Sequence, residues 1–115
     1  TEYARMLDKS LGSIDWNVSA AEIERLIRGL NPWPSAYTDW DGRVMKIWEA
    51  QVTAGQETGE TPGTVIGVEK DGFCVQTGQG VLKVLALQIP GKKRMDAGAF
   101  LRGYPMKPGT ILAKR

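Results

Sequence analysis

The sequence lacks histidine entirely and contains a single cysteine, Cys74. Without histidine the chain has no example of the commonest general base and metal ligand near neutral pH, and one cysteine cannot complete a zinc site by itself. One cysteine also excludes an internal disulfide, as is usual in a reducing compartment. Because Cys74 stands between Phe73 and Val75, we expect a small buried side chain rather than a reactive thiol.

Long apolar runs are absent too. No segment approaches the ~20 apolar residues that a membrane-spanning helix requires, and no secretory signal is present. The glycines form neither a phosphate loop nor a dinucleotide fingerprint, because Gly78-Gln79-Gly80 stands between expected strands and precedes no helix. These absences favour a cytoplasmic protein with no membrane partner and no metal or cofactor in this domain.

The 115 residues are enough for one domain with a modest core. The chain begins at Thr1 rather than Met, and its first thirteen residues offer few apolar anchors, namely Tyr3, Met6, Leu7 and Leu11. We therefore expect residues 1–13 to be the tail of an interdomain linker and residues 14–115 to form the folded domain.

Residues 19–30 predict a capped helix. Ser19 followed by Glu22 has the spacing of a capping box, in which each side chain pairs with a backbone N–H that the helix start leaves unpaired. An apolar stripe at helical spacing follows, formed by Ile23, Leu26, Ile27 and Leu30. Pro32 and Pro34 cannot continue the helix, and Trp33 lies between them.

The rest of the chain alternates strand patterns with glycine turns. Strands are expected at residues 36–40, 43–52, 64–69, 73–77 and 81–89, with a tight hairpin at Asp41-Gly42. Residues 54–62 carry no apolar side chain beyond Ala54 and predict a loop. Five short strands predict a mainly β fold, a small closed barrel that the helix covers.

Two shorter features lie near the C-terminus. Asp96 is placed to cap a short helical turn over residues 99–101, which Gly103 ends. Pro108-Gly109-Thr110 echoes Pro62-Gly63-Thr64. We interpret the echo as two similar strand entries rather than a true repeat, since no longer period is visible.

Charge is distributed unevenly along the chain, although the net charge is only +2. Residues 1–80 contain seven Lys or Arg and twelve Asp or Glu, a balance of −5, whereas residues 81–115 contain eight and one, a balance of +7. Such asymmetry predicts a surface with one strongly basic side, as is typical of proteins with a polyanionic partner.

The best candidate for contacts with such a partner is the run Lys92-Lys93-Arg94 after Pro90-Gly91. Three cations on a loop can reach phosphates without constraint from helix or strand geometry, although an ordinary solvated charge run is the alternative. Arg43, Lys46 and Lys83 are strand cations. Such residues can line the nucleic-acid face of a barrel or protect sheet edges from aggregation.

Arg28 is a further candidate on the polar face of the helix. Its spacing from Glu24 also fits an intrahelical ion pair, as does the spacing of Glu22 and Arg25. We favour the ion-pair interpretation for Arg25 and leave both open for Arg28.

Tryptophans could supply stacking surfaces for bases. Packing is the better interpretation for Trp16 and Trp33, which flank the helix, and for Trp48 in the most apolar strand. Trp40, directly before the Asp41-Gly42 turn, is the one that we expect to be partly exposed.

Six segments together resemble the C-terminal domain of methionyl-tRNA formyltransferases and follow the family's order: Ile14-Asp15-Trp16, Ile27 to Pro34, Lys46-Ile47-Trp48, Pro62-Gly63-Thr64, Gln76 to Leu82 and Leu87 to Met95. The resemblance implies a barrel of the oligonucleotide-binding type that helps to hold initiator methionyl-tRNA. Besides the tRNA, the expected partner is an upstream catalytic domain of the same polypeptide. We expect the protein to be a monomer. The parent enzyme would transfer a formyl group from 10-formyltetrahydrofolate to the methionyl amino group.

The family's catalytic half carries an Asn–His–Asp constellation and a Ser-Leu-Leu-Pro loop for the folate, and neither matches a segment of this sequence. We therefore expect this chain alone to be inactive. Two alternatives stay open: the equivalent domain of a formyltransferase for an amino-sugar nucleotide or folate, and a scaffold at a domain interface. The balance of +7 after residue 80 disfavours the first, which needs no extended basic surface.

Overall fold

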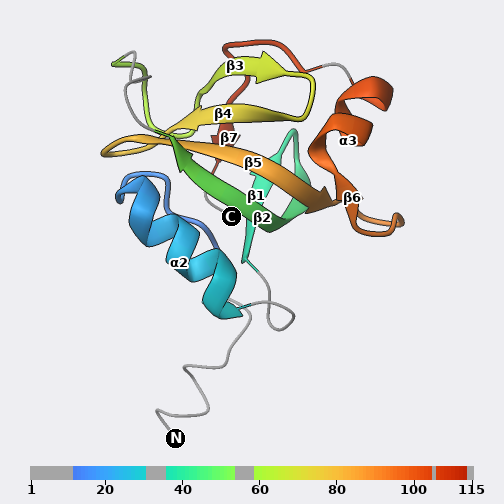
Figure 1. Cartoon of the computed structure of the whole chain (residues 1–115), viewed down its shortest axis with the longest axis horizontal. Helices are drawn as coiled ribbons and strands as arrows, with labels where there is room; N and C mark the ends of the chain where they lie inside the picture. The colour runs from blue at the N-terminus through green and yellow to red at the C-terminus, as the bar shows by residue number, and fades with distance from the viewer. Residues whose placement is uncertain (1–11, 31–35, 54–58, 105, 114–115) are drawn as a thin grey trace, which may run out of the picture.

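The computed structural model describes residues 12–30, 36–53, 59–104 and 106–113. Most of the expected linker, the Pro32-Trp33-Pro34 segment and residues 54–58 of the expected loop lie outside the described residues. The elements, coloured along the chain in Figure 1, are α2 (Ala20–Leu30), β1 (Ala36–Trp40), β2 (Arg43–Thr53), β3 (Val65–Glu69), β4 (Gly72–Gln76), β5 (Val81–Gln88), β6 (Met95–Asp96), α3 (Ala97–Gly103) and β7 (Leu112–Ala113).

The strands form one antiparallel sheet in the order β3-β4-β5-β2-β1-β7, with β6 paired to β5. The hairpin predicted at Asp41-Gly42 is confirmed: both residues have positive φ, 51° and 81°, as a two-residue hairpin turn requires. The register of β2 on β5 shifts between Ile47 and Glu49. Trp48 therefore sits at a bulge, where the strand bends.

The two ends of the sheet are joined by backbone hydrogen bonds. Val65 N–H donates to the Thr110 carbonyl over 2.8 Å, Gly109 N–H to the Val65 carbonyl over 2.7 Å, and Leu112 N–H to the Gly63 carbonyl over 2.8 Å. These bonds bring the start of β3 against the chain that leads into β7. The backbone groups at the two ends of the curled sheet therefore pair with each other there, rather than remaining as open edges. The mainly β, barrel-like fold predicted from the sequence is confirmed.

The joined segments are the two Pro-Gly-Thr echoes. Each forms a turn in which the Thr N–H donates to the carbonyl three residues before it, Thr64 to Thr61 over 3.1 Å and Thr110 to Lys107 over 3.2 Å. The glycines have φ of 96° and 99°, which fits a turn with Pro second and Gly third. The echo is therefore two matching turns that pair with each other, a relation that the sequence interpretation did not include.

Helix α2 covers the sheet where β2 and β5 pair, and α3 lies beside the end formed by β4, β5 and β6 (Figure 1). Ile23 and Ile27 of the predicted stripe are buried, and Leu26 packs against the core with partial exposure. Trp16 is buried as expected, and its indole N–H donates to the Thr38 hydroxyl over 2.9 Å. That hydroxyl donates in turn to the Ala113 carbonyl over 2.7 Å. The chain before α2 is thereby tied to both β1 and β7.

Cys74 is 2% exposed, and burial raises the pKa of its thiol. The expectation of a small buried side chain is confirmed.

Both predicted helix caps differ in detail from their expected hydrogen bonding. The Ser19 hydroxyl accepts from the Glu22 N–H over 3.2 Å, as in a capping box, but the Glu22 carboxylate accepts from that hydroxyl rather than from a backbone N–H. Asp96 occupies the N-cap position of α3 without a side-chain cap bond. It also pairs with Ala86 as part of β6, a two-residue strand too short for sequence periodicity to reveal.

The cap of α2 can be tested with Ser19→Ala. Loss of the hydroxyl that accepts from the Glu22 N–H should lower the free energy of unfolding by about 1 kcal/mol. Ser19→Asn keeps an acceptor at the N-cap and should behave like the wild type. Chemical denaturation compares the three proteins, and an unchanged stability of Ser19→Ala would refute the cap.

Sheet closure can be tested with Gly63→Ala against Gly109→Ala. Both glycines have positive φ, so both substitutions carry backbone strain of about 1 kcal/mol. A Cβ at Gly63 would lie 2.5 Å from the Leu112 carbonyl oxygen, whereas one at Gly109 meets nothing within 4 Å. Gly63→Ala should therefore cost roughly 1–3 kcal/mol more than Gly109→Ala in the same denaturation experiment. Equal losses would mean that the contact between Gly63 and Leu112 does not constrain the fold.

Candidate nucleic-acid interface

The predicted run of cations lies in the connection between β5 and β6, here called the cationic loop (residues 90–94). Its first half is another Pro-Gly turn, in which Lys92 N–H donates to the Ile89 carbonyl over 3.1 Å and Gly91 has φ of 80°. Lys92, Lys93 and Arg94 are all exposed. The turn therefore fixes the backbone of the loop while the cationic side chains point to solvent.

Gln88 fastens this loop to the sheet. Its side-chain amide nitrogen donates to the Lys92 carbonyl over 2.9 Å, and its amide oxygen accepts from the Trp48 indole N–H over 3.0 Å. One side chain therefore links β5, the bulge of β2 and the loop. Sequence reasoning did not select Gln88, although its place in the Leu87-Gln88-Ile89-Pro90-Gly91 segment was noted.

Arg94 differs from the two lysines in its surroundings. Its guanidinium carbon lies 5.3 Å from the centre of the Trp48 ring, and its Nη2 lies 3.7 Å from a Glu49 carboxylate oxygen. Among the described residues, Lys92 and Lys93 form no ion pair. The lysines thus offer uncompensated charge, whereas Arg94 is held over an aromatic ring beside an acid.

Lys46 is the strand cation that the fold brings to the loop. It pairs across the sheet with Gln88 and is exposed. Beside it lies a surface hollow of about 290 Å³, lined by Val44, Lys46, Gln88, Ile89, Pro90 and Gly91. The structure therefore gathers Lys46, Lys92, Lys93 and Arg94 around one region of the surface, here called the loop face.

Lys83 lies elsewhere on β5 and is already neutralised. Its ammonium is 2.6 Å from a Glu69 carboxylate oxygen and 2.9 Å from one of Asp71, and its side chain is only 16% exposed. The hydrogen bonds to Glu69 and Asp71 raise the pKa of Lys83 above its ordinary value. In the described sheet β5 runs between β4 and β2, so Lys83 is not the edge-strand charge that the sequence left open.

Arg28 and Arg43 also have local partners. Arg28, for which the sequence left both interpretations open, forms a salt bridge with Glu24 on α2. Arg43 is exposed with its guanidinium 5.1 Å from the centre of the Trp40 ring, and β2, on which it lies, is an inner strand of the described sheet rather than an edge. The fold does not bring either residue into the loop face.

The tryptophans divide between core and surface. Trp40 is partly exposed, as predicted, and packs edge-on against Phe100 and Tyr104. Trp48 was expected to pack inside, but it stands outside the core cluster of the described residues, half-buried under Arg94. Strand alternation accounts for its position, because the residue before Trp48 in β2 is buried and a strand directs successive side chains to opposite faces.

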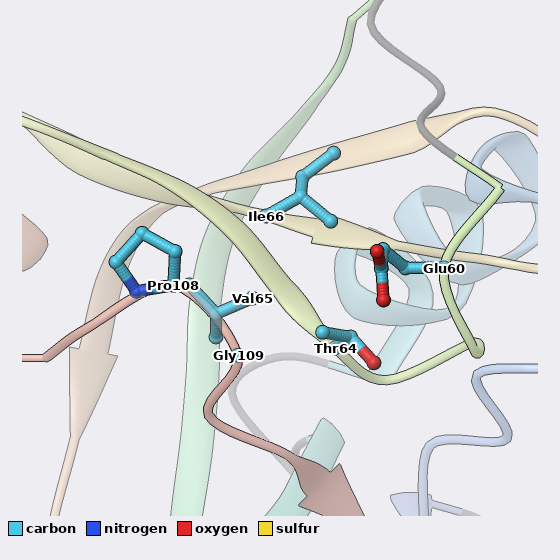
Figure 2. Close-up of a pocket in the computed structure, with 6 residues that line it drawn as sticks. All are labelled: Glu60, Thr64, Val65, Ile66, Pro108 and Gly109. Atoms are coloured by element: carbon cyan, nitrogen blue, oxygen red, sulfur yellow. The ribbon is translucent and has the colours of Figure 1, made fainter.

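Other hollows offer less to a polyanion. Figure 2 shows one of about 190 Å³ at the junction of the sheet ends, lined by Glu60, Thr64, Val65, Ile66, Pro108 and Gly109. The described residues that line it include no cation. The hollow beside α3 mixes Lys70 and Arg102 with Glu49, Asp71 and Asp96. Within the described ranges there is no group of side chains able to hold a metal ion, and no helix is long and apolar enough to cross a membrane.

The Lys83 cluster predicts a pH dependence. The hydrogen bond from Lys83 holds the pKa of the Asp71 carboxyl below its ordinary value of 3.8. A depressed folded-state pKa stabilises the fold above the unfolded value, and the effect is lost as pH falls through the folded value. Wild type should therefore lose more stability than Asp71→Asn between about pH 5 and about pH 2. In a Lys83→Gln background this difference should vanish, and its persistence in thermal melts would contradict the pairing.

Comparison with known proteins identifies the family. Residues 6–105 match the family model described as formyl transferase, C-terminal domain. Methionyl-tRNA formyltransferase of Lachnospira eligens is 51% identical over 97% of this chain and 37% of its own length. The enzyme of Agathobacter rectalis is 50% identical over 95% of this chain and 35% of its length. The chain thus spans about a third of the length of these curated relatives.

Solved structures agree on the fold. HypX from Aquifex aeolicus, in complex with tetrahydrofolic acid, matches with a TM-score of 0.63 and 18% identity over 94% of this chain and 21% of its own. A variant of the same protein matches with a TM-score of 0.66. At this identity the likeness shows the fold alone. From the family model and the relatives, we conclude that the chain belongs to the family of formyltransferase C-terminal domains, as its sequence motifs predicted.

Proposed function

We propose that this chain is the tRNA-positioning domain of a methionyl-tRNA formyltransferase. The curated relatives carry that name, and this chain corresponds to about a third of their length. Catalysis then belongs to an upstream domain of the same polypeptide. That domain transfers the formyl group from 10-formyltetrahydrofolate to initiator methionyl-tRNA in the cytoplasm.

The observation that carries the proposal is the uncompensated charge of the loop face. Lys46, Lys92 and Lys93 are exposed and form no ion pair among the described residues, while Lys83 and Arg28 are neutralised by neighbouring acids. Exposed cations without acidic partners are the groups that exchange counterions for phosphates. We therefore assign phosphate contacts to these three lysines.

The loop face is also suited to hold its ligand in one orientation. The Pro-Gly turn and the two hydrogen bonds of Gln88 fix the loop backbone before any ligand arrives. A surface that is ordered in advance loses less entropy on binding. Such contacts bring the acceptor end of a large substrate to a distant reaction centre and leave the chemistry to other residues.

The fold alone does not separate tRNA from the alternative substrates, since HypX shares this fold at 18% sequence identity. A domain that only walls a catalytic cleft has no need of exposed, uncompensated lysines. The identity of about 50% to methionyl-tRNA formyltransferases also favours tRNA as the substrate.

The test is the double variant Lys92→Ala/Lys93→Ala. Its affinity for initiator tRNA should fall at low salt, and the log–log slope of affinity against salt should flatten by about 0.7–0.9 for each lost phosphate contact. In the full-length enzyme the same change should raise KM for tRNA and leave kcat nearly unchanged.

Lys70→Ala/Lys107→Ala is the matched control. It removes the same charge from exposed residues of other turns. It should leave the salt slope near that of the wild type. Equal losses of tRNA affinity in both variants would mean that only net charge matters. Unchanged tRNA binding in both variants would refute the assignment of phosphate contacts to Lys92 and Lys93.

A further inference from the structure

Arg94 presents a flat surface rather than a free charge. Its guanidinium lies over the Trp48 ring at 5.3 Å, and its Nη2 lies 3.7 Å from a Glu49 carboxylate oxygen. The side chain of Arg94 is 53% exposed. The acid compensates the charge of Arg94 and disfavours a phosphate at this position, whereas the outer plane of the guanidinium stays accessible to solvent.

The support beneath Arg94 is rigid. The Trp48 indole N–H is bound by Gln88, and the same Gln88 amide holds the Lys92 carbonyl. Ring, guanidinium and loop are therefore connected through one side chain. The hollow of about 290 Å³ adjoins this support, because Gln88 also lines it, together with the apolar residues Val44 and Pro90 and the cation Lys46.

A flat cation backed by an aromatic ring, next to a partly apolar hollow and uncompensated lysines, matches the chemistry of an unpaired nucleotide. Unstacked bases bind on guanidinium planes and aromatic rings, whereas paired bases inside an RNA helix are not available for such contacts. Phosphates contribute charge that lysines bind without reference to the base.

We infer that the Trp48–Arg94 pair and the adjoining hollow bind one unpaired nucleotide of a structured RNA, with its base stacked on Arg94 and its phosphate held by Lys46 and Lys92. This inference rests on the proposed function and adds to it a preference for unpaired over duplex RNA. The lysines supply affinity for any RNA, and the stacked pair supplies the discrimination.

The experiment compares three labelled RNAs at one salt concentration: a blunt duplex, the same duplex with one bulged nucleotide, and the same bulge with an abasic nucleotide. The wild-type chain should bind the bulged RNA about tenfold more tightly than the duplex, the scale of one stacked base. The abasic bulge should lose that preference, which separates stacking from bending of the duplex.

Arg94→Lys is the deciding variant, because it keeps the positive charge and removes the planar guanidinium group on which a base could stack. It should bind the blunt duplex as the wild type does and show no preference for the bulge. Arg43→Lys is the matched control, since Arg43 also lies over a tryptophan, 5.1 Å from the Trp40 ring, but outside the loop face. It should keep the preference. Because both arginines are exposed, neither change is expected to disturb folding.

Equal affinity of the wild type for all three RNAs would overturn this inference and leave the proposed function standing. A preference that survives in Arg94→Lys, or that disappears in Arg43→Lys, would also overturn it. Failure to bind any RNA, including initiator tRNA, would overturn both proposals.

Discussion

The fold depends on the backbone hydrogen bonds that join residues 63–65 to residues 109–112. Each of these segments enters through a Pro-Gly turn, and the first needs a glycine both for its positive φ and for the approach of the Leu112 carbonyl. An open sheet in this order would leave β3 and β7 as unpaired edges. Pairing of these ends removes both edges, and the inner strands β2 and β5 give the loop face a stiff base.

The arrangement of the inner strands explains why two strand lysines that look alike in the sequence have different surroundings. Lys46 and Lys83 lie on adjacent strands, but Lys46 faces the β5–β6 connection while Lys83 faces the acids of the β3–β4 hairpin. Glu49 and Trp48 restrain Arg94 in the cationic loop, whereas the lysines beside it form no ion pair among the described residues. The positive charge of the cationic loop that no acid compensates therefore resides in Lys92 and Lys93.

Much of this was accessible from sequence because it is local. The capping pair Ser19 and Glu22, the hairpin at Asp41-Gly42 and the loop position of Lys92 depend on residues within a few positions of each other. The ion pairs of Lys83, the hydrogen bond between Trp48 and Gln88 and the pairing of the two Pro-Gly turns join segments far apart in the chain. A single sequence carries no signal for such contacts, since strand order and bulges arise only from the whole sheet.

The loop face is the proposed site of RNA contact, and backbone and indole NMR signals during titration with initiator tRNA test this most directly. We expect the largest shifts at Lys46, at the Trp48 indole N–H and at residues 91–94. Signals of Lys83 and of the junction around Gly63 should change little. Shifts centred on the Lys83 cluster or on that junction, with the loop face unaffected, would contradict the account.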